Sequence, residues 1–380
     1  MNVLIIPDKF KGTLTASAAA EAIARGWRRA RAGDSIELLP MSDGGDGFGD
    51  VMSQLLHAKV QKIKTVDAAH RPCVANWWWE PKSKTAVIES ANVIGLAKLP
   101  PGKFHPFDLD TYGLGALIFA AASKGAKRCI IGIGGSATND GGFGLALVLG
   151  WKFWDRDAVL IERWTELHRL ARILPPRRRR WFEELIVAVD VQNPLLGIRG
   201  ATRVYGPQKG LRSSEFREAD GNLRGLAGVV GRFVVPPSGG SDRLKPELQA
   251  VPGAGAAGGL GFGLMAFLGG RAEPGFELFA RLAKLDERLR AADLVITGEG
   301  CIDDSTFMGK GVGEIARRCR KEKIRCIALA GKITARATAK RIFSEAYALT
   351  ELTSAAKAKS NSAAWLERLA ERTAKHWPAS

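Results

Sequence analysis

Short apolar runs, each ending in a polar loop rich in glycine or aspartate, recur along this chain. They do not alternate apolar with polar residues, a pattern typical of strands that are buried on both faces of a parallel sheet. The runs predicted as strands cover residues 3–6, 36–39, 129–133, 185–189, 294–296 and 326–329.

Helical periodicity fills several of the intervals between these runs. Residues 15–27 place Ala19, Ile23 and Trp27 on one face, and Thr13 or Thr15 is a suitable N-cap. Further helices are predicted over residues 143–149, 282–291, 312–321 and 363–376, the last after a loose loop at 355–362. Strands that alternate with helices predict an α/β sheet, which binds its ligands beyond the carboxyl ends of the strands.

Residues 58–99 have a different texture, which predicts antiparallel strands. The strands expected there cover residues 59–66, 77–79 and 86–89, with a turn at 80–84. The tryptophan triplet at 77–79 is interpreted as part of a core or a dimer contact rather than as a stacking platform. This region is expected to begin a second domain inserted in the first.

Length and composition narrow the class of protein. A chain of 380 residues is too long for one typical core, and 46% apolar with 25% charged residues is typical of a globular protein. No window approaches the ~18 consecutive apolar residues of a membrane helix. The apolar start of the chain predicts a buried strand rather than a signal peptide. Five scattered cysteines favour free thiols in a reducing cytoplasm and argue against structural zinc.

The net charge of +17 fits either a nucleic-acid surface or a site for anionic substrates. The densest basic run, residues 177–180, is interpreted as a solvated turn between a helix and a strand. The rest of the basic excess is spread along helices without interleaved aromatic residues, so a nucleic-acid partner is not favoured, and neither is a membrane.

The loop at residues 131–142 is the most informative segment. It follows a predicted strand, precedes a predicted helix, and contains five glycines together with a serine, a threonine, an asparagine and an aspartate. Glycine tolerates positive φ and lets backbone N–H groups approach an anion closely. The loop therefore predicts a phosphate site.

Simple nucleotide motifs leave alternatives open. A Walker A loop fails at Gly309-Lys310, because Gly311 follows and Asp304 stands where the first glycine belongs. The pattern Gly132-x-Gly134-x-x-Ala137, with Asp155 beyond it, allows an NAD-dependent oxidoreductase. A similar pattern at residues 253–258 lacks a preceding strand.

Charged side chains in the predicted strand-end loops favour phosphoryl transfer. That reaction needs carboxylates to hold Mg²⁺ and to accept a hydroxyl proton, and it needs lysines to neutralise the transferred group. The acidic residues in such loops are Asp8, Asp43, Asp46, Asp140, Asp190, Glu299, Asp303 and Asp304, and the lysines are Lys9, Lys11, Lys209 and Lys310.

Long motifs in these loops resemble the bacterial glycerate kinase family. They begin with Asp8-x-Phe10-Lys11-Gly12, the loop from Met41 to Gly47, Thr111-Tyr112-Gly113 and the glycine loop ending at Gly142. They continue with Asp190-Val-x-Asn193-Pro194-Leu195, Tyr205-Gly-Pro-Gln-Lys209-Gly210, the glycine-rich run 252–261 and Thr297-Gly-Glu-Gly300. The resemblance runs in order over nearly the whole chain.

The resemblance implies an ATP- and Mg²⁺-dependent kinase that acts on D-glycerate and makes phosphoglycerate, generally the 2-phosphate, in glyoxylate and glycerate metabolism. It also implies a flavodoxin/Rossmann-like parallel-sheet domain interrupted by a second α/β domain, with the active site in the cleft between them. Residues 1–60 and 285–380, with part of 105–150, are expected in the first domain and residues 61–284 in the second. A cytoplasmic location is expected, and a homodimer is one of the oligomeric states that the sequence leaves open.

Four positions depart from the family pattern. Lys9 stands where a serine is usual, Ser42 where alanine is frequent, Cys301 where arginine is usual and Ser305 where glutamine is usual. Loss of that arginine would remove a bidentate clamp on a carboxylate or phosphate, for which Lys9 could compensate.

Roles follow as hypotheses from residue type and loop position. Lys11 is expected to act in catalysis and to bind substrate, and Asp190 or Asp303 to be the base. The remaining substrate-binding candidates are Asp8, Ser42, Asp43, Gly44, Gly45 and Asp46. The ATP-binding candidates are Gly134, Gly135, Ser136, Thr138, Asn139, Asp140, Lys209 and Lys310. The candidate metal ligands are Asp190, Glu299 and Asp303.

Overall fold

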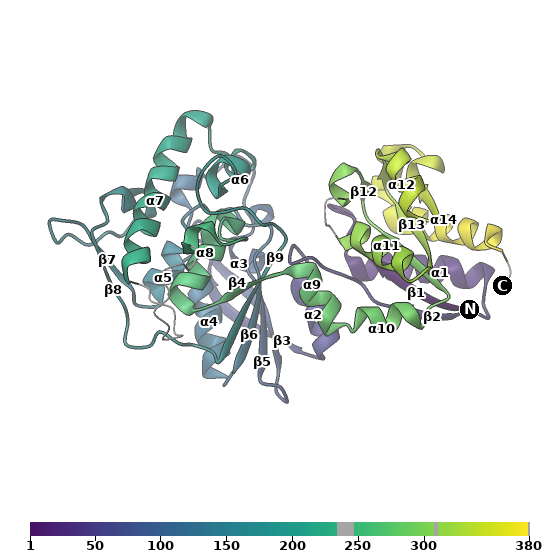
Figure 1. Ribbon diagram of the computed structural model, residues 1–380, viewed down its shortest axis with the longest axis horizontal. Helices are drawn as coiled ribbons and strands as arrows, with labels where there is room; N and C mark the ends of the chain where they lie inside the picture. The colour runs from purple at the N-terminus through teal and green to yellow at the C-terminus, as the bar shows by residue number, and fades with distance from the viewer. Residues whose placement is uncertain (234–246, 308–310, 379–380) are drawn as a thin grey trace. The chain divides into compact units, whose positions relative to one another are not determined.

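The computed structural model describes residues 1–233, 247–307 and 311–378, and the chain divides into two compact units (Figure 1). The first unit combines residues 1–43 with residues 276–380, and the second is the continuous segment 44–275.

A five-stranded parallel sheet forms the centre of the first unit. Its strands, in spatial order, are β15 (Glu345–Ala348), β13 (Arg325–Ala330), β11 (Leu294–Gly298), β1 (Asn2–Pro7) and β2 (Ser35–Leu38). Every neighbouring pair is parallel. All five carboxyl ends therefore lie at one edge of the sheet.

Two long helices, α1 (Ala16–Ala30) and α14 (Ser362–His376), share a core with one face of this sheet. Thr15 caps α1, since its side chain accepts a hydrogen bond from the Ala18 N–H at 3.1 Å. Trp27 is fully buried on the same helix. The other elements of this unit are α9 (Gly275–Leu282), α10 (Leu285–Arg290), β12 (Cys301–Ile302), α11 (Gly311–Lys321), β14 (Lys332–Ile333), α12 (Arg336–Ile342) and α13 (Ala355–Ser360).

A six-stranded mixed sheet forms the centre of the second unit. Its strands, in spatial order, are β10 (Arg271–Pro274), β9 (Glu184–Val189), β6 (Arg128–Gly132), β5 (Thr85–Glu89), β4 (Pro72–Glu80) and β3 (Lys59–Val66). The first four are mutually parallel, and β4 is antiparallel to both of its neighbours. The helices and short strands of this unit are α2 (Phe48–Leu56), α3 (Ala91–Ile94), α4 (Leu114–Ser123), α5 (Phe143–Val148), β7 (Lys152–Trp154), β8 (Arg172–Leu174), α6 (Ala201–Lys209), α7 (Phe216–Phe233) and α8 (Ala256–Leu268).

The predicted strands are confirmed, but they belong to two sheets. Four of the six apolar runs form β1, β2, β11 and β13 of the first sheet, and two form β6 and β9 of the second. The antiparallel texture of residues 58–99 is also confirmed by the β3–β4–β5 pairing. Trp77 and Trp78 are buried, and the Trp78 ring packs against Gly49 of α2, so the triplet lies in a core strand.

Two expectations about helices are corrected. The helix predicted over residues 282–291 is interrupted, because Lys284 adopts a left-handed conformation (φ +48°) between α9 and α10. The loop expected before α14 is largely helical, since Ser354 caps α13 by accepting a hydrogen bond from the Lys357 N–H.

The division of the chain differs from the expected boundaries. Residues 44–60 and the whole of 105–150 lie in the second unit, and residues 276–284 lie in the first. The reason is strand pairing: β6 hydrogen-bonds with β5 and β9 rather than with the first sheet.

Within the described residues, no helix combines the length and the apolar character that crossing a bilayer requires.

Candidate functional site

Carboxylates gather at the carboxyl edge of the sheet in the first unit. Asp8 follows β1 and Glu299 follows the adjacent β11, and the Asp8 N–H donates to the Gly298 carbonyl at 2.8 Å. Burial and the neighbouring carboxylate of Asp43, which follows β2, raise the pKa of Asp8 to about 7, with Lys9 opposing and Glu299 adding to the rise. Three acids from three strand ends therefore share one electrostatic environment.

A tight turn orders the segment after Glu299. The Thr306 hydroxyl donates to Oε1 of Glu299 at 2.7 Å and accepts from the Asp303 N–H at 3.2 Å. The Asp303 carboxylate in turn accepts from the Ser305 N–H at 2.8 Å. Glu299 and Asp303 are thus held on one short segment, and both side chains remain partly exposed.

Lys11 lies on the exposed turn after β1, beside the same segment. A Cβ on Gly300 would lie 3.2 Å from the Lys11 backbone nitrogen, so the two turns touch. Cys301 follows Gly300 in β12 and stands opposite Lys332 of β14. Lys332 is exposed, so a lysine stands beside the position where the family arginine is missing.

Two glycine-containing loops interlock in the second unit. The Gly134 N–H donates to the Gly44 carbonyl at 3.1 Å, and a Cβ on Gly134 would lie 2.5 Å from the Gly45 Cα. A Cβ on Gly135, which has φ +75°, would lie 2.2 Å from Oδ1 of Asp46. At Gly134 a Cβ would force the backbone of one loop to move, and at Gly135 the positive φ disfavours a side chain and a Cβ would displace the Asp46 carboxylate. Residues predicted separately for substrate and for ATP are therefore neighbours.

The glycine loop is braced from its other side by the segment after α3. Ser136 forms an antiparallel bridge with Gly95, through the Leu96 N–H to the Gly135 carbonyl at 2.9 Å and the Ala137 N–H to the Ile94 carbonyl at 2.8 Å. These hydrogen bonds hold the loop in place at the end of β6, and Gly135 at its tip is exposed.

The second half of the loop is buried. Both carboxylate oxygens of Asp140 are occupied, accepting from the Thr111 hydroxyl at 2.7 Å and from the N–H groups of Thr111, Gly142 and Gly144. Burial raises the pKa of Asp140 to about 6. The fully buried Asn139 donates to the Thr202 hydroxyl at 3.2 Å, and Thr138 is fully buried as well. Asp140 fixes the start of α5, whereas Thr138 Oγ1 and Asn139 Oδ1 are buried without a hydrogen-bond partner among the described residues. In the predicted ATP-binding set, Gly135 is exposed, Gly134 is half-buried and Ser136 is only 6% exposed.

Lys209 reaches the glycine loop from beneath. It ends α6, is 6% exposed, and donates from Nζ to the Thr138 carbonyl at 2.7 Å and to Ser136 Oγ at 3.1 Å. Burial lowers the pKa of Lys209 to about 7, and the charge of Asp140 opposes that shift. The other predicted lysine, Lys310, lies outside the described residues.

Asp190 follows β9 and is exposed. The loop beyond it is fixed by Asn193, which accepts from the Tyr205 hydroxyl at 2.6 Å and donates to the Arg199 carbonyl at 2.8 Å. Burial and the nearby Asp190 charge raise the pKa of Tyr205 to about 12, so this hydroxyl stays protonated.

The predicted metal ligands do not form a ready-made centre. Asp190 belongs to the second unit and Glu299 and Asp303 to the first, and among the described residues no three His, Cys, Asp or Glu side chains are gathered to hold an ion. The donor type still fits Mg²⁺, which prefers carboxylate oxygens and keeps several waters. Burial and then the charge of Asp43 raise the pKa of Asp8, and a cation there would offset the repulsion between the two carboxylates.

Sequence reasoning missed Glu89 at the end of β5. Its two carboxylate oxygens accept from the N–H groups of Gly47 and Gly49 at 3.0 and 2.9 Å, and so it anchors the start of α2 and the loop before it. Burial raises its pKa. An acidic residue that directly follows an apolar strand was the available signal. The sequence contained no signal for Thr111, which positions Asp140, or for Thr306, which positions Glu299.

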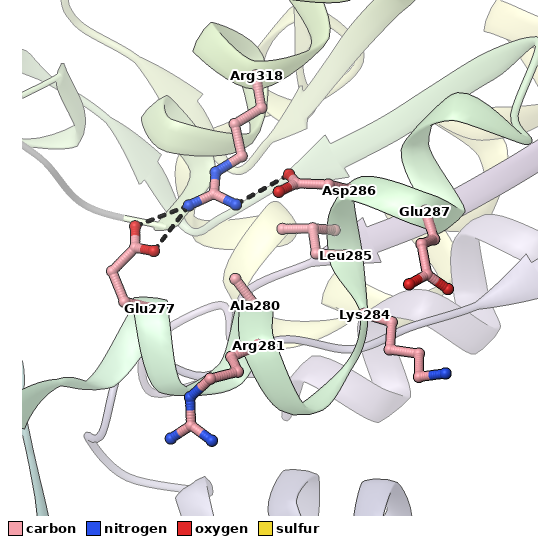
Figure 2. A pocket seen from close by; sticks show the side chains of 8 residues that line it. All are labelled: Glu277, Ala280, Arg281, Lys284, Leu285, Asp286, Glu287 and Arg318. Carbon is pink, nitrogen blue, oxygen red and sulfur yellow. Dashed lines mark hydrogen bonds and ion pairs between the residues drawn. The ribbon is translucent and has the colours of Figure 1, made fainter.

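A charged depression elsewhere in the first unit is not part of either strand-end group (Figure 2). It measures about 280 Å³ and lies along α9, α10 and α11. Arg318 spans it by donating to Glu277 at 2.8 Å and to Asp286 at 3.0 Å (Figure 2). None of the residues predicted for the site lines it, so we assign it to an ion-pair network.

The alternative motifs have structural explanations. Asp155, the candidate ribose ligand of an NAD site, accepts from the N–H groups of Asp157 and Val159 and forms a turn. In the run at 253–258, Gly258 packs so closely that a Cβ would lie 1.9 Å from the Thr138 carbonyl oxygen. In the basic run, Arg180 donates to the carbonyls of Phe182 and Glu183, as expected of a turn.

Both units carry polar groups at the carboxyl ends of parallel strands: carboxylates in the first unit, and a glycine loop with a buried lysine in the second. Polar groups at this place in parallel sheets are typical of α/β enzymes. The family described as the glycerate kinase family matches residues 3–378. The chain belongs to that family, and it is accordingly an ATP-using phosphotransferase.

Individual relatives agree with this assignment. The chain is 38% identical over 339 residues to a glycerate kinase of Halalkalibacterium halodurans, covering 88% of this chain and 86% of the relative. It is 37% identical over 342 residues to glycerate 2-kinase of Escherichia coli K12, with coverage of 88% and 86%. A crystal structure described as a candidate glycerate kinase 2 from Salmonella typhimurium LT2 superposes with a TM-score of 0.81 at 31% identity, covering 98% of this chain and 97% of that one.

Proposed function

We propose that this chain phosphorylates D-glycerate at the 2-hydroxyl, with ATP and Mg²⁺, to give 2-phosphoglycerate. The observation that carries the proposal is the interlocked pair of loops in the second unit, where Gly134 and Gly135 pack closely against Gly44–Asp46. Such a loop lets an anion approach the backbone without the bulk of a Cβ. A relative named glycerate 2-kinase supports the 2-position.

In the second unit, the loop formed by Gly134, Gly135 and Ser136 would hold the ATP phosphates. Phosphoryl transfer depends mainly on positioning and on neutralising charge, so a rigid loop with a lysine beneath it suits the task. Asp190, exposed at the end of β9, is one candidate for the base that accepts the glycerate hydroxyl proton.

In the first unit, Lys11 and the loop at Ser42 and Asp43 would bind the glycerate carboxylate and its hydroxyls. Asp303 is the second candidate base. Glu299, with whichever of Asp190 and Asp303 is not the base, would hold Mg²⁺. When bound, the metal would neutralise part of the charge of the transferred phosphoryl group.

The test is purified protein with ATP, Mg²⁺ and D-glycerate, with product carried through enolase in the absence of phosphoglycerate mutase. Signal through enolase supports both the kinase reaction and the 2-position. Release of ADP without that signal would contradict the 2-position, and mass measurement of the product would then separate 3-phosphoglycerate from simple ATP hydrolysis.

Two controls sharpen the result. L-glycerate and other small hydroxy acids, run in parallel, test the alternative that a different hydroxy acid is the substrate. Saturable NADH binding without any ADP release would instead support the oxidoreductase alternative. The cytoplasmic location and the homodimer that the sequence allows stay predictions, which fractionation and light scattering would test.

A further inference from the structure

Lys209 is a buried cation without a salt bridge among the described residues. Its Nζ makes two hydrogen bonds, both to neutral oxygens of the glycine loop: the Thr138 carbonyl and Ser136 Oγ. Burying an ammonium group without an ionic partner is costly, and burial accordingly lowers the pKa of Lys209 to about 7. The side chain is enclosed by the loop, so it does not reach the exposed tip at Gly135.

The hydrogen bonds of the Ser136 hydroxyl indicate how the charge of Lys209 can act. A serine hydroxyl has one proton to donate and lone pairs to accept with. The ammonium of Lys209 donates to Oγ, which fixes the accepting side of the hydroxyl toward the interior. Within the part of the chain that the structure describes, the hydroxyl proton has no recorded acceptor. It is therefore left to point away from Lys209.

The backbone fixes the rest of the geometry. The bridge between Ser136 and Gly95 holds the main chain of the loop. A backbone movement that reoriented the Ser136 hydroxyl would break this bridge. A hydroxyl that accepts from a cation is also a stronger donor, since hydrogen bonds in a chain polarise one another.

We propose that Lys209 is a positioning residue that aims and strengthens the Ser136 hydroxyl as a donor to a nucleotide phosphate, without touching the phosphate itself. The inference rests on the proposed function, because it takes the Gly134–Ser136 loop to be the ATP site. In this arrangement Lys209 does not contact the phosphate directly; its charge acts on the phosphate through the Ser136 hydroxyl.

A double-mutant cycle tests this coupling. The variants are Lys209→Met, Ser136→Ala and the pair together, with affinity for MgATP measured by calorimetry. We expect each single variant to bind MgATP about 10-fold more weakly, the effect of one charge-assisted hydrogen bond. The double variant should be no weaker than Ser136→Ala alone, because Lys209 has nothing left to act through. Losses that multiply would overturn the proposal.

A matched control is Ser90→Ala, which removes a buried hydroxyl at the end of the neighbouring β5, where Ser90 Oγ has no partner among the described residues. It should leave MgATP affinity unchanged. A purely structural role of Lys209 predicts instead that Lys209→Met lowers the melting temperature and MgATP affinity equally in both backgrounds. If Lys209→Met does not fold, Lys209→Arg replaces it, and the expected result is retained affinity that is lost again on adding Ser136→Ala.

A pH profile supplies the second readout. Asp140 is the charged group whose field acts on Lys209, and it is itself enclosed by four donors. Because Lys209 loses its proton near neutrality, wild-type affinity for MgATP should fall as pH rises from about 7 to 9. Lys209→Arg should flatten that fall, as should Ser136→Ala. An unchanged slope in both would contradict the mechanism. If wild type binds no MgATP at all, the proposed function fails first, and the activity assay identifies that outcome separately.

Discussion

The two units use opposite means of handling charge at the same kind of position. Both place their polar groups at the carboxyl ends of parallel strands. The first gathers acids, and burial beside Asp43 raises the pKa of Asp8 to about 7. The second gathers backbone donors over a buried cation, and burial lowers the pKa of Lys209 to about 7. One architecture thus brings an acid and a base to the same pKa from opposite directions.

The difference matters because the contributions of Asp8 and Lys209 to the free energy of unfolding change over different pH ranges. Asp8 binds a proton more tightly in the folded chain than in the unfolded chain, so its contribution falls as pH rises from about 4 to 7. Lys209 holds its proton less tightly when folded, so its contribution rises with pH from about 7 to 10. The cost of ionised Asp8 is therefore complete above about pH 7, the cost of protonated Lys209 is complete below about pH 7, and both are present in part or in full between about pH 4 and 10.

The largest expected effect concerns which unit supplies the base. Asp190→Asn and Asp303→Asn differ only in the unit they disturb. We expect the variant that removes the base to lower kcat by roughly 100- to 10,000-fold at unchanged protein stability. Steady-state kinetics with D-glycerate, alongside thermal melts, measure both. Near wild-type kcat in both variants would refute the assignment of either residue as the base.

Filling the space between the interlocked loops should have the next largest effect. Gly134→Ala places a methyl group where the Gly45 Cα lies 2.5 Å away, so one loop must move. If this loop holds the ATP phosphates as proposed, moving it by about an ångström should lower kcat/KM about 100-fold. Gly33→Ala in the first unit is the control, since a Cβ there meets nothing within 4 Å. Equal kcat/KM for the two variants would show that the contact is unimportant.

Removing the charge of Asp8 should stabilise the fold. Asp8→Asn eliminates a crowded carboxylate, so we expect the free energy of unfolding at pH 8 to rise by roughly 1–3 kcal/mol. Urea unfolding in EDTA measures this, and the gain should vanish at pH 4, where Asp8 of the wild type is protonated in the folded chain. A gain of the same size at both pH values would point to packing rather than charge.

Restoring the family arginine should have the smallest effect. Cys301→Arg adds a bidentate donor near Lys332, and we expect the KM for glycerate to fall a few-fold with kcat nearly unchanged. Cys301→Lys, which adds charge without the planar fork, should do less. If KM and kcat are the same in all three proteins, the clamp hypothesis is wrong.

Much of the fold could be predicted because apolar runs report burial directly. The run at 185–189 and the run at 294–296 both became strands for that reason. Their assignment to different sheets could not be predicted, because the runs look alike and pairing depends on segments far apart. The boundary after Asp43 was hidden for a related reason: the loop from Ser42 to Asp46 is continuous in sequence but is shared by both units.

The site was predicted at the level of loops rather than side chains. The glycine loop was recognisable from composition, but composition did not show that Asp140 is fully buried and Ser136 nearly so, while Gly135 next to Ser136 is exposed. Burial of Lys209 had no signal either, since α6 carries little apolar periodicity around it. Orientation of a side chain in a loop depends on partners such as Thr111 and Gly95, which only the folded chain brings together.

The first unit is built from two segments far apart in the sequence, and this fixes the order in which its parts are made during synthesis. β1 lies between β2 and β11 in the sheet, and α1 packs on α14 near the other end of the chain. The ribosome must therefore make residues 44–275 before β11, the second sheet partner of β1, and α14, the helix that packs on α1, exist. At roughly 5–20 residues per second, the first strands wait on the order of 10–50 s with unpaired edges. The second unit, being continuous, can complete its sheet in that interval.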